Sequence, residues 1–156
     1  MPKITLENGI EVEISQESYN NLVKAVQPKT YDDIAKLLFL DQQVYFLQND
    51  GSIKNIETLR SLWELPNNCT THKQAEKLLA INKMMNVAKY LNGDWKPAFD
   101  SKTTNWMIYY DVSTLTIAGY AYTHCSFVYF KTKELAQQAI EILGEETIKL
   151  ALSTDW

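Results

Sequence analysis

The stretch that decides the fold class is residues 3–14, which read KITLENGIEVEI. Apolar residues alternate with polar ones on both sides of Asn8 and Gly9. Both of these residues tolerate the positive φ angles that a tight hairpin turn needs, so the pattern predicts an antiparallel hairpin. A second hairpin is expected further along, where residues 44–47 and 52–56 flank a turn at residues 49–51.

Helix signals lie outside these hairpins, and each begins at a residue that can cap a helix N-terminus. The expected helices are 15–27, ending before Pro28, then 30–40, about 72–91, about 132–143, ending at Gly144, and 145–152, with a helical turn over 57–64. The residues expected to face inward are Tyr19, Leu22, Val23, Val26, Ile34, Leu37, Leu38, Ala75, Leu78, Leu79, Ile81, Met85, Ala88, Leu91, Leu135, Ala136, Ala139, Ile140 and Leu143.

Three strands are expected after the long helix, over 106–110, 115–122 and 125–130. The predicted fold class is therefore α+β, with antiparallel β-hairpins and a C-terminal three-stranded antiparallel sheet packed against one long and several shorter helices. The best candidate for a boundary is the break at residues 65–68. It separates a ββα-α-ββ region, residues 1–64, from an α-βββ-α region, residues 70–156, and the sequence leaves open whether the two share one core.

Composition limits the function classes. The formal net charge is -4, and the basic residues are 14 Lys and one Arg, Arg60. Binding of nucleic acid by bulk charge would need a basic excess, and bidentate phosphate recognition favours arginine, so a dedicated phosphate clamp is not expected. There are two cysteines, no signal-peptide pattern and no apolar run of about 18 residues. We therefore expect a cytoplasmic protein with reduced thiols and no membrane association.

Catalytic and metal motifs are sparse. The only soft-ligand set is Cys69 with His72 and His124 with Cys125. Adjacent residues on a strand point to opposite faces, so the second pair is a poor half-site and no metal ion is expected. The chain has no P-loop, no glycine-rich dinucleotide loop and no nucleophile elbow. No catalytic residue and no cofactor are predicted, and an enzyme is not favoured.

Aromatic residues around the expected C-terminal strands are the candidate binding residues. Exposed rings on a sheet suit stacking on bases or anchoring of a protein partner. The alternative is that helices or a dimer mate cover both faces of the sheet. The six candidates are Trp95, Trp106, Tyr109, Tyr110, Tyr120 and Tyr122.

A resemblance adds context. The segments KLLA at 77–80, NGDWKP at 92–97, WMIYY at 106–110 and FKTKELA at 130–136 together resemble small proteins encoded by bacteriophages and prophages. The resemblance covers about half of the chain, and the linker at 92–97 is its most specific part. It implies a phage or mobile-element setting in a bacterial host, and it carries over no catalytic residue.

These observations favour a non-enzymatic binding protein that contacts a host protein or a second copy of itself. An acidic surface would suit docking to a basic partner. One alternative is a nucleic-acid binder that uses the aromatic sheet with the lysines at 83, 89, 96, 102, 131 and 133. Another is a small-ligand-binding protein or enzyme with a pocket between the two regions.

Overall fold

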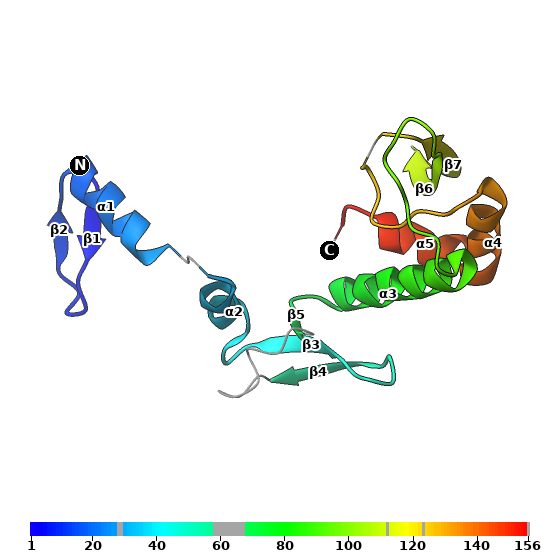
Figure 1. Cartoon of the computed structure of the whole chain (residues 1–156). Helices are drawn as coiled ribbons and strands as arrows, with labels where there is room; N and C mark the ends of the chain where they lie inside the picture. Colours follow the sequence, from blue (N-terminus) through cyan, green and yellow to red (C-terminus); the bar gives the residue numbers. More distant parts are fainter. Residues whose placement is uncertain (28–29, 58–67, 112, 123, 156) are drawn as a thin grey trace.

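The computed structural model describes residues 1–27, 30–57, 68–111, 113–122 and 124–155. It mixes helices with small antiparallel sheets, which confirms the α+β class (Figure 1). The strands are β1 (Lys3–Thr5), β2 (Glu11–Glu13), β3 (Gln43–Leu47), β4 (Ile53–Glu57), β5 (Asn68–Cys69), β6 (Asn105–Asp111) and β7 (Thr114–Tyr120). The helices are α1 (Gln16–Val26), α2 (Tyr31–Phe39), α3 (His72–Asn92), α4 (Lys133–Leu143) and α5 (Glu145–Leu152).

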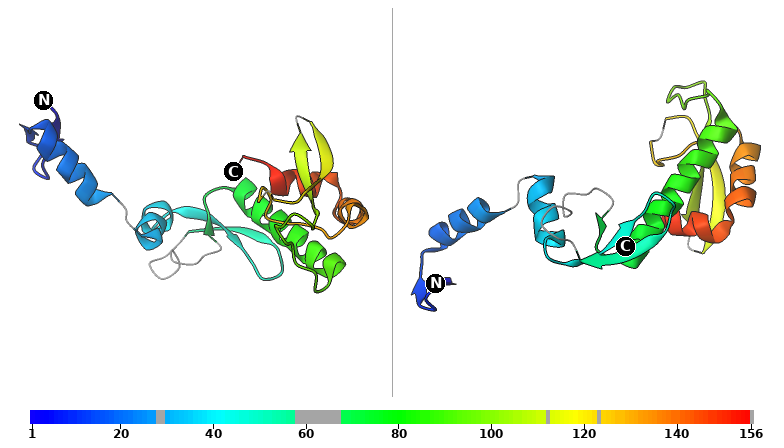
Figure 2. Two further views of the ribbon diagram at one scale, coloured as in Figure 1. Left: turned by 45° about the horizontal axis from the view of Figure 1, so that its top comes forward. Right: turned by 90° about the horizontal axis from the view of Figure 1, so that it is seen from below.

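The N-terminal hairpin and the helix that follows it are confirmed. Ile4 pairs with Val12 across β1 and β2, and Gly9 in the turn has a φ of 80°. The Ser15 hydroxyl accepts a hydrogen bond from the Ser18 backbone N–H, which caps α1. In Figures 1 and 2, β1, β2 and α1 extend away from the other elements.

The second hairpin is confirmed as β3 and β4, and β5 pairs with the other edge of β3. A capping box between Thr30 and Asp33 begins α2, as the pattern predicted. The predicted inward face of α2 is wrong, because Ile34, Leu37 and Leu38 are all exposed. The side chains of α2 that enter a small apolar cluster are instead Ala35 and Phe39, which join Val44 and Ile56 of the hairpin.

The helical turn expected at 57–64 lies outside the described residues except for Glu57, which belongs to β4, and residues 65–67 of the expected boundary lie outside them as well. Asn68, the last residue of the expected break, is buried in β5 and pairs with Phe46 of β3. The helix α3 begins four residues later, at His72, capped by the Thr71 hydroxyl, and it contacts β3, β4 and β5. Elements before and after the expected break are therefore in contact, because α3 and β5 follow it and both contact β3.

The larger core lies between α3, α4, α5 and β6, with β7 at its margin (Figure 2). Its fully buried anchors include Met84, Ile108, Phe130 and Ile148. The inward positions predicted for α4 are confirmed, since Ala136 and Ala139 are buried and their neighbours on that face pack against the core. For α3 the prediction is wrong at Leu78 and Met85, which are exposed.

The third strand of the C-terminal sheet is the main correction. β6 and β7 pair along their whole length, but the segment expected as a third strand makes one isolated bridge, between Phe130 and Trp106. Beyond it, the hydroxyl of Ser126 donates to the Val128 carbonyl at 2.8 Å and accepts from the Val128 N–H at 3.2 Å. Because Val128 bonds within its own segment, the ladder to β6 ends after one bridge.

Candidate functional site

The six aromatic candidates differ in exposure and in the face on which they lie. Tyr110, Tyr120 and Tyr122 are exposed, Tyr122 by 67%, whereas the other three are half-buried. Strand alternation places Trp106 and Tyr110 on one face of the β6–β7 ribbon and Tyr109 on the other. Trp106 packs against the core. The rings are thus distributed over both faces of the ribbon.

Trp106 is held by a close approach of the two strands. It lies opposite Gly119, and a Cβ added there would meet two carbons of the Trp106 ring at 3.2 Å and the Thr104 methyl at 2.6 Å. Trp95 lies in the linker after α3, where its backbone N–H donates to the Asn92 carbonyl at 3.1 Å. The contacts of the Trp106 ring give that tryptophan a structural role.

A groove of about 880 Å³ opens where the expected third strand leaves β6. Ligand-binding cavities commonly measure ~300–1,000 Å³. The groove lies within the C-terminal region, whereas the sequence suggested a pocket between the two regions. Residues from α3, β6, the 124–127 segment and α5 line it: Gln74, Lys77, Leu78, Ile81, Ile108, Tyr109, Tyr110, His124, Cys125, Ser126, Phe127, Ala151 and Leu152. Two of the six aromatic candidates, Tyr109 and Tyr110, are among them.

The outer wall of the groove is held by contacts around Tyr129. Its hydroxyl accepts hydrogen bonds from the backbone N–H groups of Cys125 and Ser126, at 2.8 and 3.0 Å. The His124 ring stacks on Phe99 with centroids 3.4 Å apart, and Phe99 meets Tyr129 edge to face. The 124–127 segment is therefore held by Tyr129 and Phe99, and it touches β6 where the Cys125 sulfur lies 3.2 Å from the Met107 sulfur.

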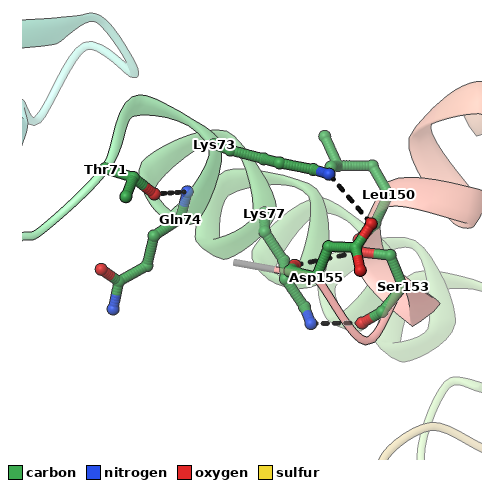
Figure 3. Close-up of polar contacts among 7 residues, drawn as sticks. All are labelled: Thr71, Lys73, Gln74, Lys77, Leu150, Ser153 and Asp155. Atoms are coloured by element: carbon green, nitrogen blue, oxygen red, sulfur yellow. Dashed lines mark hydrogen bonds and ion pairs between the residues drawn. The ribbon is translucent and has the colours of Figure 1, made fainter.

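The other wall is formed where the end of α5 lies against the start of α3 (Figure 3). Lys73 pairs with Asp155 at 3.1 Å, and the Lys77 ammonium donates to the Ser153 carbonyl. The Ser153 hydroxyl in turn donates to the Leu150 carbonyl at 2.9 Å. Lys77 also lines the groove, and none of the described lining residues is acidic.

The histidines and cysteines that the structure describes do not gather into a metal-binding cluster. The Nδ1 atom of His72 lies 3.4 Å from a carboxylate oxygen of Glu76, and its ring contacts the Tyr45 ring edge to face. Burial raises the pKa of the Cys69 thiol, which keeps it protonated and a poor nucleophile. Among the residues that the structure describes, no group of three or more histidine, cysteine, aspartate or glutamate side chains could hold a metal ion.

A second candidate surface was not predicted from the sequence. We call residues 1–27 the arm, which contains β1, β2 and α1, and no residue in it is buried. Apolar side chains are nonetheless exposed along it: Leu6, Ile10, Val12, Tyr19, Leu22 and Val26. The amphipathic pattern was visible in the sequence, but it was interpreted as an inward face within the molecule.

No family model matches this chain, and no curated protein or solved structure is significantly similar to it. In the part of the chain that is described, no helix is long and apolar enough to cross a membrane.

Proposed function

We propose that this chain is a protein-binding module whose arm makes the principal contact with a protein partner. The observation that carries the proposal is that the arm exposes the six apolar side chains named above, as well as Met1, and buries none of its residues. Single exposed apolar residues are ordinary on protein surfaces, but a contiguous element without any buried face is typical of an interaction segment.

The physics of small elements supports the same conclusion. Isolated helices shorter than ~12–15 residues are marginal in water, and so is a lone two-stranded hairpin. The helix α1 has 11 residues, and each strand of the arm has three. Such elements become stable when a partner covers their apolar face. A partner would therefore stabilise the arm at the same time as it binds.

An energy estimate shows what the contact can supply. Burying the exposed part of each apolar side chain contributes about 1 kcal/mol, so the arm offers about 6 kcal/mol before costs. Association costs ~4–15 kcal/mol. One arm alone therefore supports only weak binding, and a stable complex needs a second contact. Exposed Tyr120 and Tyr122 could add to it, as aromatic residues often anchor interfaces.

A lipid surface is a poorer match for the arm than a protein. Helices that lie on membranes are rich in lysine and arginine on their polar face. The arm contains four glutamates and two lysines, and only Lys24 of these lysines lies in α1. The suggested phage or mobile-element setting and the nucleic-acid alternative stay predictions that rest on the sequence alone.

The test is capture of partners from a bacterial lysate by the tagged full chain, followed by direct titration of the purified partner. We expect Leu22→Glu to weaken binding at least tenfold, because it places a charge in the apolar stripe of α1. The matched control is Ile142→Glu on α4, since Ile142 is 52% exposed and Leu22 is 47% exposed. Equal binding by both variants would refute the role of the arm.

A further inference from the structure

The molecule exposes two apolar surfaces, which are the helix α1 of the arm and the groove beside β6, called here the β6 groove. On α1, the apolar residues Tyr19, Leu22, Val23 and Val26 are spaced i, i+3, i+4 and i+7. This is the spacing with which an amphipathic helix fills an apolar groove. We propose that α1 of one copy docks in the β6 groove of a second copy, so that the chain self-associates by exchange of arms. The proposal rests on the arm being a protein-binding element.

The groove offers apolar walls to such a helix. Leu78 and Ile81 of α3 form one side, and Phe127 of the 124–127 segment forms another. Leu78 and Phe127 are 39% and 47% exposed, although both line a concave surface. Insertion of the Leu22 side chain between them would cover apolar area on both copies. The groove exists because Ser126 satisfies the Val128 backbone and ends the ladder to β6.

Charge also favours the pairing. The arm carries four glutamates against two lysines, and Glu17 lies in the first turn of α1, close to Tyr19. The groove contributes the positive charge of Lys77, and none of its described lining residues is acidic. The helix α1 itself carries one glutamate and one lysine, so the attraction to this wall comes from the excess of glutamate in the arm as a whole.

The arm that would fill the groove of one molecule belongs to a second molecule, because the arm and the groove of a single chain lie far apart. Figures 1 and 2 place α1 at the opposite end of the molecule from α3, β6 and α5, which form the groove. An arm that fills the groove in this conformation comes from a second molecule. The contact joins two different surfaces, because the arm of one copy meets the groove of the other. Reciprocal exchange between two copies closes it as a dimer, and each association event then buries two arms.

The first experiment measures self-association of the purified full chain by sedimentation equilibrium. The wild type is expected to form dimers at micromolar concentrations. Leu22→Glu, in the arm, and Leu78→Glu, in the groove, should each weaken dimerisation at least tenfold. Ile142→Glu is the control and should leave it unchanged. Both Leu22 and Leu78 are exposed in the monomer, so neither variant is expected to unfold the chain.

Mixing the two variants gives a sharper test. The arm of Leu78→Glu is intact, and so is the groove of Leu22→Glu, so a mixture contains one working arm-and-groove pair per heterodimer. We expect the mixture to associate more tightly than either variant alone. Tighter association on mixing is specific to a contact between an arm and a groove. An interface of two arms against each other would gain nothing from mixing.

A chemical cross-link locates the contact. Cys125 lines the groove and is exposed, whereas Cys69 is fully buried. Oxidation of Leu22→Cys or Val26→Cys should therefore give a disulfide-linked dimer through Cys125 of the second copy. Adding Cys125→Ser should remove this product, and Ile142→Cys should not form it.

Four results would overturn the proposal. A wild type that stays monomeric at 100 μM excludes exchange of arms. A dimer weakened by Leu22→Glu but not by Leu78→Glu shows that the arm binds elsewhere, which leaves the proposed function intact. Insensitivity to both variants, together with unchanged capture of lysate partners, would refute the function as well. Association that requires an added small molecule would assign the groove to that ligand instead.

Discussion

The contact between Gly119 and the β6 strand yields a prediction that can be worked out from distances. A Cβ at position 119 would lie 2.6 Å from the Cγ2 methyl of Thr104 and 3.2 Å from two carbons of the Trp106 ring. Favourable carbon contacts lie at ~3.5–4.0 Å, so Gly119→Ala forces these groups to move. Because threonine is branched at Cβ, its methyl group has few alternative positions.

The magnitude follows from two opposing effects. Overpacking of this kind costs about 1–3 kcal/mol. Replacing a strand glycine by alanine returns ~0.5–1 kcal/mol through the lower entropy of the unfolded chain. We therefore expect Gly119→Ala to lower the free energy of unfolding by about 1–2 kcal/mol. Thr104→Ser removes the nearest atom, and in the double variant it should recover about 1 kcal/mol of the loss, which is a coupling that a double-mutant cycle measures.

The assay is equilibrium urea unfolding followed by tryptophan fluorescence, with a shared slope for all variants. Thr116→Ser on β7 is the matched control. It makes the same chemical change, but the three atoms nearest to a Cβ at position 119 belong to Thr104 and Trp106. The reasoning is refuted if Gly119→Ala is as stable as the wild type. It is also refuted if Thr104→Ser and Thr116→Ser give the same recovery.

Two further predictions concern the linker between α3 and β6. Asn105 is fully buried, and its side chain donates to the Ala98 carbonyl at 2.7 Å and accepts from the Ala98 N–H at 3.1 Å. Asn105→Leu leaves both backbone groups without this partner, so urea unfolding should show a loss of about 2–3 kcal/mol, and a loss below about 0.5 kcal/mol would contradict it. The backbone N–H groups of Lys102 and Thr103 hold the pKa of Asp100 below its ordinary value of 3.8. The charged carboxylate therefore stabilises the fold above pH 3.8, and this stabilisation is lost as the pH falls through the lower pKa of the folded state. Asp100→Asn should therefore be less stable than the wild type at neutral pH, with a difference that shrinks below pH 3.8, whereas a difference independent of pH would rule out this linkage.

The sequence predicted the elements whose signals are local. Asn8 and Gly9 define a hairpin turn, Thr30 and Asp33 complete a capping box, and Gly144 follows α4, and each of these signals depends only on neighbouring residues. The face of α3 was predicted less well. This helix contacts β3–β5 as well as α4 and α5, so its buried residues lie in two stripes and include Ala75 and Met84.

The candidate site could be predicted only in part. Exposure of Tyr110, Tyr120 and Tyr122 agrees with the expectation that some rings of the ribbon face solvent. The groove could not be predicted, because it depends on Ser126 diverting the Val128 backbone from β6. The strand pattern of residues 125–130 does not reveal that competition between side-chain and ladder hydrogen bonds.

The burial of Cys69 gives this chain a built-in probe of local opening. Its thiol lies in β5, fully covered between the three-stranded sheet and α3, and burial raises its pKa. An alkylating reagent reaches such a group only in molecules whose β5 has separated from its neighbours. The labelling rate of Cys69, compared with that of exposed Cys125, therefore reports the free energy needed to part the strand from the helix in an otherwise folded molecule.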